Sequence, residues 1–393
     1  MTQNSVTLPP QASFSPWQWA KKNLFSSWFN TVLTFICIWF LYQLVSNFWI
    51  WATTKAQWAV VGSNLRLFLV GLYPVSEFWR LWSILAIAGS LSGISWGVWG
   101  RFSRTVAIAI GALSIALAIL LPVDIIAKVL TLAISGVIAL GFVIGQQCKR
   151  FESSSLFLAI AWFASLPVSL WLVGGNLGLT AVDVNVWNGL VLTLIVAIAG
   201  IVFSFPLGVL LALGRQSTLP LIKIFCVFYI ELVRGLPLIG ILFMAQVMLP
   251  LFLPAGLEVD RVLRAIAAFV FFSAAYLAEN VRGGLQSIPK GQAEAARALG
   301  LSIPLTIALI ILPQALKASI PAIVGQFIGL FKDTSLVAIV GLVDLMGVAR
   351  TVLSQPEFIG RYAEVYLFVA LIYWVFCFSM SQASQKLERK LNK

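Results

Sequence analysis

Residues 287–315 read SIPKGQAEAARALGLSIPLTIALIILPQA, a stretch in which a polar run separates two apolar segments. Charged side chains are costly inside hydrocarbon, so we expect this run at a membrane surface. Ser287 and Pro289 indicate a helix start, the alanines favour the helix, and Gly300 indicates its end. The stretch therefore predicts one short surface helix at about residues 287–300, followed by a sharp turn. The polar residues of the run are Lys290, Gln292, Glu294 and Arg297.

The chain around this stretch has the composition of a membrane protein. Its 393 residues are 60% hydrophobic and only 10% charged, and they include 15 tryptophans and 28 phenylalanines. Soluble globular proteins do not have this balance. Apolar runs of about 20 residues recur, and each is long enough to cross the hydrocarbon core as a helix. We therefore predict an all-α, polytopic membrane helical bundle in contact with lipid.

Charge and cysteine content exclude two other classes of function. The net charge is +12, but the basic residues are scattered among short loops, so they predict no nucleic-acid partner. The chain has no histidine, and its four cysteines stand far apart without the spacing of a metal site. We predict no metal and no cofactor. The cysteines are Cys37, Cys148, Cys226 and Cys377.

Ten apolar segments are long enough to span a bilayer, five on each side of a glycine-rich break at Gly174–Gly178. We interpret residues 1–29 as a cytoplasmic tail, 30–173 as an accessory transmembrane region, 187–386 as a second domain and 387–393 as a basic cytoplasmic tail. The accessory region either assists assembly and lipid contact or has no specific role. The predicted spans are about Asn30–Ile50, Leu81–Gly100, Thr105–Leu121, Ile125–Gly145, Leu156–Val173, Trp187–Leu213, Leu221–Pro250, Val262–Val281, Ile303–Leu330 and Glu364–Gln382.

Basic residues predict the orientation of these spans. With the N-terminal tail in the cytoplasm, the inside loops hold more Lys and Arg than the outside loops, as the positive-inside rule requires. Ten crossings then place both termini and the 287–300 helix in the cytoplasm, where a soluble partner can reach them.

The run YIELVRGLPLIGILF, residues 229–243, places Glu231 and Arg234 within a predicted span. A charge in hydrocarbon costs several kcal/mol unless it faces protein or water. Either the two residues neutralise each other as a structural pair, or they face a water-filled path and meet a zwitterionic solute. Gly235 and Pro237 favour the path, because they break the helix and broken helices in transporters line cavities.

A second polar cluster ends the span Ile303–Leu330. It is either a solvated helix end, with Asp333 or Thr334 capping the next helix, or part of a polar path. The stretch after it, Val337–Val348, is apolar but too short to span a bilayer. We interpret this stretch as a re-entrant or interfacial element that gates the outer mouth. The cluster consists of Lys332, Asp333, Thr334 and Ser335.

The surface helix carries a recognisable pattern: Glu294-Ala295-Ala296, then Gly300 after three residues, then Ile310-Ile311-Leu312-Pro313 after nine more. This pattern resembles the EAA loop of ABC importer permeases. The resemblance implies a coupling helix that docks into a cleft of a cytoplasmic ATPase, and small alanines would let another surface approach closely. The alternative is an ordinary amphipathic connector. The predicted ATPase-coupling residues are Glu294, Ala295, Ala296, Arg297 and Gly300.

Four longer stretches are similar to the polar-amino-acid subfamily of these permeases, above all to the long permeases of general L-amino-acid uptake systems. They are ELVRGLPL, AENVRGGLQSIPKGQAEAARALGL, LPQALKASIPAIVGQFIGLFKDTSL and SQASQKLERK. The resemblance covers most of residues 187–386 and implies a five-helix permease core, multi-pass in the inner (plasma) membrane. It places Arg234 and the Lys332–Ser335 region near the solute path. The subfamily often has Thr where this chain has Leu236.

The same resemblance implies a set of partners. These are a homologous permease subunit in a heterodimer, two ATP-binding subunits, a periplasmic amino-acid-binding protein and the L-amino acid itself. The chain has no GxxxxGK[ST] phosphate loop, so we predict that it is not an enzyme and that a partner hydrolyses ATP.

The residues also suggest how such a permease would hold its solute. Arg234 would bind an α-carboxylate bidentately, while Glu231 or backbone carbonyls accept the α-ammonium. Two other classes predict different behaviour. An ion-gradient-driven secondary amino acid transporter would work as the purified chain alone, and a membrane scaffold would tolerate apolar replacement of both charged residues.

Overall fold

The computed structural model describes residues 15–391 except 101–103, 121–123, 152, 255 and 257. Within these residues every regular element is helical, and β pairing is confined to isolated bridges. The prediction of an all-α polytopic bundle is confirmed. Residues 1–14 of the predicted N-terminal tail and the last two residues of the C-terminal tail lie outside the described residues.

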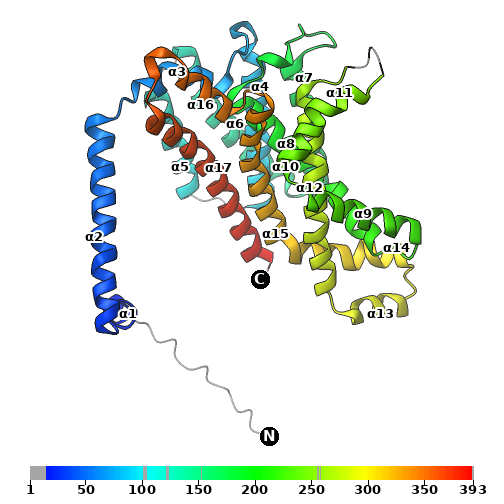
Figure 1. Ribbon diagram of the computed structural model, residues 1–393. Helices are drawn as coiled ribbons and strands as arrows, with labels where there is room; N and C mark the ends of the chain where they lie inside the picture. The colour runs from blue at the N-terminus through cyan, green and yellow to red at the C-terminus, as the bar shows by residue number, and fades with distance from the viewer. Residues whose placement is uncertain are drawn as a thin grey trace. The chain divides into compact units, whose positions relative to one another are not determined.

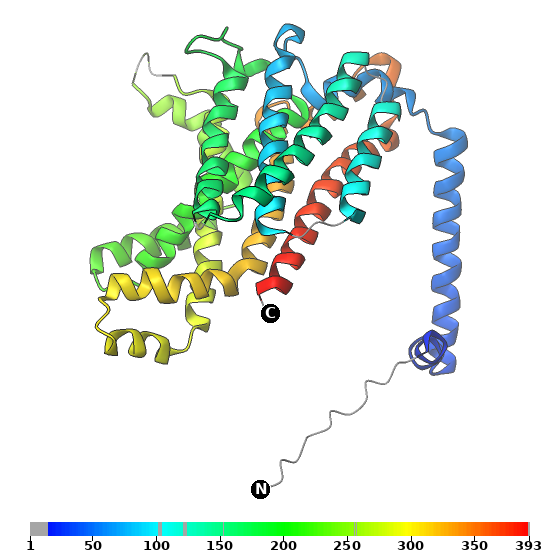
Figure 2. The same cartoon turned by 180° about the vertical axis from the view of Figure 1, so that it is seen from behind.

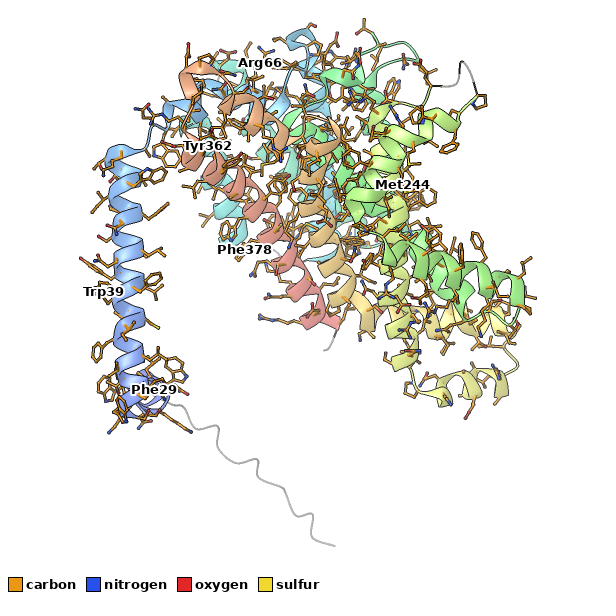
Figure 3. All side chains as sticks on the ribbon, viewed as in Figure 1. Phe29, Trp39, Arg66, Met244, Tyr362 and Phe378 are labelled. Atoms are coloured by element: carbon orange, nitrogen blue, oxygen red, sulfur yellow. The ribbon has the colours of Figure 1, made fainter. Side chains whose placement is uncertain are left out.

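The first of two compact units ends at Trp58 and contains one long apolar helix, α2. Its start is fixed by Ser27, whose side chain accepts a hydrogen bond from the amide of Asn30 at 3.2 Å. None of its side chains is buried, and Figure 3 shows Trp39 on the outside of the helix. A bare apolar helix of this length suits a surrounding of lipid. The unit's helices are α1 (Pro16–Asn23), α2 (Trp28–Ile50) and the π-helical turn η1 (Trp51–Lys55).

The second unit begins with the helices that we call the extension, α3 to α7. In it, α4 and α6 approach closely: a Cβ added at Gly93 would lie 2.2 Å from the carbonyl oxygen of Ile138, and one added at Gly145 would lie 2.4 Å from that of Ile94. Small residues allow membrane helices to pack this tightly. The glycine seam consists of Gly89, Gly93 and Gly97 on α4 with Gly141 and Gly145 on α6. The bounds are α3 (Ala59–Val70), η2 (Val75–Glu77), α4 (Phe78–Trp99), α5 (Arg104–Leu120), α6 (Ile125–Cys148) and α7 (Ser154–Gly174).

Arg80 joins the extension to the loop that follows α7. Its side chain is only 1% exposed and forms an ion pair with Glu77 at 2.8 Å. The guanidinium also donates to the carbonyl and hydroxyl oxygens of Thr180, at 2.9 and 2.6 Å. A buried guanidinium requires such partners, so this contact fixes the loop between the two predicted halves of the chain.

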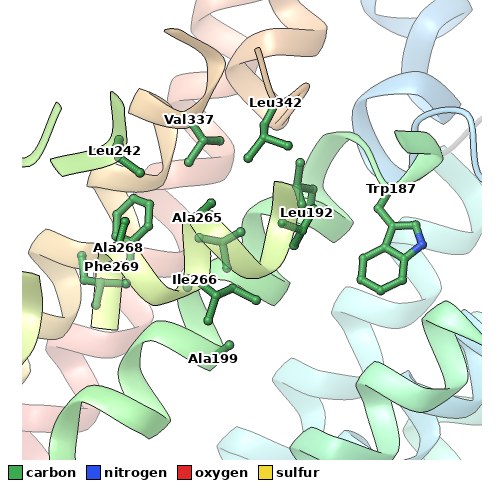
Figure 4. Packing of buried hydrophobic residues seen from close by; sticks show 14 of the residues in the cluster. Trp187, Leu192, Ala199, Leu242, Ala265, Ile266, Ala268, Phe269, Val337 and Leu342 are labelled. Atoms are coloured by element: carbon green, nitrogen blue, oxygen red, sulfur yellow. The ribbon is translucent and has the colours of Figure 1, made fainter. Parts of the chain in front are cut away.

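The core of the second unit is a bundle in which α12 packs against both α8 and α15. Figure 4 shows Leu192 of α8, Phe269 of α12 and Leu242 of α10 (Leu238–Phe243) among the buried side chains of its interior. Outside the bundle, apolar side chains such as Phe378 point outward (Figure 3), as expected of a surface in lipid. The core helices are η3 (Val184–Val186), α8 (Gly189–Arg215), α12 (Arg261–Ser287), α15 (Leu312–Asp333) and α17 (Tyr362–Leu391).

The predicted span Leu221–Pro250 is broken, as Gly235 and Pro237 indicated. The chain bends there by 103° between α9 and the helical stretch that begins with α10. Leu236 and Pro237 have extended backbones, because proline cannot continue a helix and disfavours helical geometry in the residue before it. The sequence predicted the break but not the size of the bend. The elements are α9 (Pro220–Gly235), α10 (Leu238–Phe243), the π-helical turn η4 (Met244–Met248) and α11 (Leu249–Phe252).

Ten is an approximate count of crossings. Among the described residues, eight helices are long and apolar enough to cross a membrane, and the bent pair α9–α10 would make a ninth. The predicted span Thr105–Leu121 corresponds to α5, which has 17 residues. At 1.5 Å per residue such a helix is roughly 26 Å long, shorter than the hydrocarbon core of about 30 Å.

The stretch Val337–Val348 is not one element. A 3-10 helix, η6 (Thr334–Val340), continues from α15, and Gly341 then reverses the chain with a φ of +84°. The next α-helix, α16 (Leu345–Leu353), is capped by Asp344, which accepts a hydrogen bond from the amide of Gly347 at 2.9 Å. Asp333 occupies the N-cap position of η6, but its side chain makes no capping hydrogen bond there. Residues 334–353 are called the 334–353 segment below.

The two ends of the second unit carry different elements. Figures 1 and 2 show α3 and α16 at one end, and α13 and the C-terminal end of α17 toward the opposite end. The fold thus places these two groups of elements at opposite ends of the unit, and the side of the membrane that each end faces stays a prediction. The remaining elements are α13 (Lys290–Ala298), α14 (Ile303–Thr306), the π-helical turn η5 (Ile307–Ile311) and the 3-10 turn η7 (Pro356–Phe358).

Candidate functional site

Helix α13 is the predicted surface helix, and its C-terminal turn is well defined. Gly300 has a φ of +81°, and its amide donates to the carbonyl of Arg297 at 2.9 Å. The amide of Leu301 donates to the carbonyl of Ala296 at 3.1 Å. These two bonds form a Schellman motif, which places a glycine where other residues would be strained. Gly300 thus sets the angle at which the chain leaves α13.

The N-terminal end of α13 differs from the prediction. Ser287 is the last residue of α12 and its hydroxyl donates to the carbonyl of Gly284 at 2.8 Å, so it does not cap α13. Pro289 occupies the cap position and Lys290 begins the helix. Since Ile288 and Pro289 have extended backbones, the chain turns there, and Figure 1 shows α13 running crosswise to α12.

The predicted coupling residues lie on two sides of α13. Ala296 is 4% exposed and packs toward its own chain, whereas Glu294, Ala295 and Arg297 are exposed, as is Gly300. Glutamate and arginine thus flank a small alanine on the free side. That side offers opposite charges around a place where another backbone can come close.

The charged cluster beside the helix break is larger than the predicted pair. Glu279 of α12 is its centre, because its two carboxylate oxygens contact three arginines. The distances are 2.7 Å to Arg215, 2.8 Å to Arg282 and 3.7 Å to Arg234. The cluster consists of Arg215 at the end of α8, Glu231 and Arg234 on α9, and Glu279 and Arg282 on α12.

Glu231 and Arg234 are both in the cluster, but each has another partner. Glu231 pairs with Arg215 at 2.9 Å, and Arg234 approaches Glu279 while its guanidinium lies 5.7 Å from the ring centre of Tyr276. Arg234 occupies the last turn of α9, directly before the break, and is 36% exposed. Three arginines and two glutamates give the cluster a net charge of +1, which attracts an anion.

The Lys332–Ser335 region lines a cavity of about 450 Å³. Lys332 and Ser335 border it together with Tyr366 and Tyr373 of α17. Thr334 is fully buried and its hydroxyl bonds to the carbonyl of Phe331 at 2.7 Å, so it faces the interior of the protein. Asp333 is half-buried.

The structure does not bring the two predicted parts of the solute path together. The charged cluster belongs to α8, α9 and α12, and the cavity belongs to the ends of α15 and α17 with α16. In Figures 1 and 2, α9 lies on the α13 side of the unit, while η6 and α16 lie toward the other end. A solute that used both would meet them one after the other.

Comparison with known proteins identifies the family. Residues 204–393 match the family described as "Binding-protein-dependent transport system inner membrane component". The whole chain is 38% identical to the "Inner membrane amino-acid ABC transporter permease protein YhdY" of Escherichia coli (strain K12), over 98% of that protein. The chain belongs to the ABC transporter permeases.

Relatives of this permease differ in length. The "Glutamate/glutamine/aspartate/asparagine transport system permease protein BztC" of Rhodobacter capsulatus is 38% identical over 96% of this chain. The "Probable glutamine ABC transporter permease protein GlnP" of Bacillus subtilis is 37% identical but aligns with only 51% of it, using 91% of its own length. In structure the permease is similar to a chain of the "Crystal structure of an amino acid ABC transporter with histidines", with 28% identity over 61% of this chain and a TM-score of 0.47.

As an ABC permease, this chain is a multi-pass inner membrane component of a transport system and not an enzyme. The family membership leaves the secondary-transporter and scaffold alternatives without support. Its charged cluster includes Arg215, Glu279 and Arg282, which the sequence analysis did not single out. Their common signal was their position at the cytoplasmic ends of predicted spans, but only the fold places residues so far apart in sequence around one carboxylate.

Proposed function

We propose that the permease imports polar L-amino acids across the inner membrane, together with a homologous permease subunit, two ATP-binding subunits and a periplasmic amino-acid-binding protein. The observation that carries this proposal is the full-length, 38% identical match to an amino-acid ABC transporter permease. A second long relative is named for four acidic and amide amino acids, which suits a path that recognises the part shared by all amino acids.

In this proposal both termini and α13 face the cytoplasm, and α13 docks on the ATPase. Glu294, Ala295 and Arg297 form the contact, Gly300 sets the exit angle, and buried Ala296 supports the helix from its own chain. Leu299 joins them, because its side chain is 84% exposed beside Gly300 and offers an apolar anchor. Docking then moves α12, which ends three residues before α13.

The solute path runs past the cavity at Lys332 and Ser335 and the charged cluster at Arg234. Arg234 binds the α-carboxylate as a planar, bidentate donor. Its distance of 3.7 Å from Glu279 and its 36% exposure support this role, because such a weakly held guanidinium can exchange its protein partner for a solute carboxylate. The energy comes from the ATPase, and the bundle opens alternately to each side.

The partner permease would cover α15. Lys317 and Pro321 are exposed on this helix although neither suits lipid. The exposed proline also leaves a backbone carbonyl of the helix without its usual donor. A second helical subunit on this face would remove both from hydrocarbon.

The docking of α13 is tested by Gly300→Val. The variant must hold a β-branched residue at positive φ, which costs about 1–2 kcal/mol, so we expect the co-purified ATPase to fall about tenfold. Gly300→Asn is the matched control, since Asn tolerates this conformation, and it should retain the ATPase. Among the residues that the structure describes, none lies within 4 Å of an added Cβ at this position, so internal clashes do not confuse the result. Equal ATPase recovery with Val and Asn would contradict the proposal.

The solute path is tested by Arg234→Lys in proteoliposomes that contain the complete complex. Lysine keeps the charge but loses the bidentate geometry, so we expect uptake to fall about tenfold while the ATPase still co-purifies. Arg215→Lys is a control for general disturbance of the cluster, and it should lower uptake less. Uptake by the purified permease alone under a proton or sodium gradient would instead support a secondary transporter.

A further inference from the structure

Helix α3 lies outside residues 204–393, which match the family, yet it packs mainly on the core. Its neighbours are α8, α16 and α17. Val60, Leu65 and Phe68 are buried on one face of α3, and Phe68 is completely inaccessible. This face joins an apolar cluster with Leu345, Val348, Ala349, Val352, Leu353, Val365 and Val369, most of which belong to α16.

Phe68 is the centre of this contact. Its ring lies 5.2 Å from that of Phe368 on α17, at an angle of 67°, which is an edge-to-face arrangement. The cluster around it holds five buried residues of the nine-residue helix α16. Therefore α16, which is too short to be stable by itself, is held in place by packing against α3, α8 and α17.

The end of α3 also meets the start of α8 through backbone contacts. Gly71 has a φ of +59°, and a Cβ added to it would lie 2.2 Å from the Cβ of Asn188. A Cβ added to Gly189 would lie 2.6 Å from the carbonyl oxygen of Phe68. The two segments are in direct contact through backbone atoms and the Cβ of Asn188, so a shift of α3 must shift Asn188 and Gly189 as well.

Gly189 also contacts the residues that precede α16. Its amide donates to the carbonyl of Val343 at 2.9 Å, and it pairs with Asp344 in a parallel bridge. Next to it, the hydroxyl of Thr193 accepts a hydrogen bond from the amide of Leu345 at 3.1 Å. The chain thus forms three adjoining layers: the end of α3, the start of α8, and the link between η6 and α16.

We propose that α3 is a brace for the 334–353 segment, and that Phe68 and Gly71 are positioning residues that keep this segment closed until the transport cycle opens it. The role as a gate rests on the proposed transport function. The brace explains what part of the extension does: it holds the segment that begins within Lys332–Ser335, so that the path opens only when the core helices move.

The test compares two buried phenylalanines of the extension. Phe68→Ala removes the centre of the brace, while Phe142→Ala removes an equally large side chain that packs on Trp96 in the glycine seam. The complete complex in proteoliposomes is assayed for ATP hydrolysed per amino acid imported. We expect this ratio to rise about fivefold in Phe68→Ala, within the usual range of coupling effects, and to stay unchanged in Phe142→Ala although that variant melts at a lower temperature.

A second readout needs neither ATP nor a partner. Thr334→Cys is introduced into a chain whose four native cysteines are replaced, and its labelling by a membrane-impermeant maleimide is timed. Thr334 is fully buried, so labelling reports opening of the segment. We expect labelling to be about fivefold faster with Phe68→Ala than without it, and unchanged with Phe142→Ala.

The outcomes separate the brace from the proposed function. If the wild-type complex shows no ATP-driven amino acid uptake, the proposed function fails, and the labelling rate alone decides on the brace. If Phe68→Ala leaves both the ratio and the labelling rate unchanged, or if Phe142→Ala changes them equally, the brace is refuted. Should Phe68→Ala not assemble, Phe68→Leu replaces it, and a rise of about twofold in either readout is then the expected result.

Discussion

Helices α4 and α6 meet along glycines, whereas α8, α9 and α12 meet along three arginines and two glutamates. In the glycine seam the backbones themselves touch, and no residue between Leu81 and Trp99 is charged. In the charged cluster, one carboxylate contacts three guanidinium groups, and every member is at least 15% exposed.

The glycine seam and the charged cluster differ in how easily their contacts can rearrange. A seam without side chains has one close-packed arrangement and no means of exchanging partners, which suits a fixed support. A cluster in which three cations share one carboxylate can exchange ion pairs at low cost, because the partners are partly solvated. The movable contact lies on α12, the helix that leads into α13, and the rigid contact lies in the extension.

The largest effect is expected in the seam. Gly145→Leu would place a Cβ 2.4 Å from the carbonyl oxygen of Ile94, so α4 and α6 must separate, at a cost of about 3 kcal/mol. Gly136→Leu on the same helix is the matched control, since no described residue lies within 4 Å of its added Cβ, and it should be neutral or slightly stabilising. Thermal unfolding of both variants in detergent measures the difference. Similar melting temperatures would show that the seam does not hold α4 and α6 together.

A smaller effect is expected in the charged cluster. Glu279→Gln leaves three arginines around a neutral amide, and we expect a loss of about 2 kcal/mol, less than for a fully buried ion pair because the arginines remain partly solvated. Glu231→Gln is the control, because Glu231 is 56% exposed and has one partner. It should change stability by less than about 1 kcal/mol. Equal melting temperatures for the two variants would contradict the prediction that Glu279 stabilises the cluster more than Glu231 does.

The smallest effect that we expect is a pH dependence of stability, which should arise in the core and not in the glycine seam. Burial raises the pKa of Asp344, which lies outside the spanning helices, to about 6. A carboxyl with a raised pKa contributes stability that is complete below its unfolded pKa and is lost as pH rises through 6. Lowering the pH from 7 to 5 should therefore raise the free energy of unfolding by about 1 kcal/mol through Asp344 in the core. The glycine seam holds no titratable group, so it should contribute no change.

Asp344→Asn is the variant that isolates this contribution. Asn keeps the cap on α16, since its side-chain oxygen still accepts from the amide of Gly347, but it cannot titrate. Between pH 5 and pH 7 the melting temperature of the wild type should fall relative to that of the variant, because only the wild type has this carboxyl to ionise. An unchanged pH dependence in the variant would assign the effect to another group.

Helix α13 could be predicted because its signals are local. Pro289, the alanines and Gly300 fix the start, the body and the end of α13 within a dozen residues, and the structure places the helix within two or three residues of the prediction. The break at Gly235 and Pro237 was predictable for the same reason. Its angle was not, because packing against α8 and α12 determines how far α10 turns away.

The partners in the charged cluster could not be predicted. Arg215, Glu231 and Glu279 are 16 to 64 residues apart in sequence, and nothing local links them. Glu231 and Arg234 were recognised because charges are rare in apolar spans, but the arginines at helix ends looked like ordinary loop residues. The packing of α3 could not be predicted either, because its 12 residues are too few to span a bilayer. A short apolar helix next to tryptophans indicates only a position at the membrane interface.

The contact between Phe68 and α16 limits how far the protein can be shortened. A truncated chain that begins at Gly189, the start of α8, would lose the cover that α3 gives to Val348, Val352 and Leu353. These side chains would then face water, and α16 would fray. A workable minimal version must therefore retain residues 59–71 as a tethered peptide or replace the exposed apolar face of α16 with polar residues.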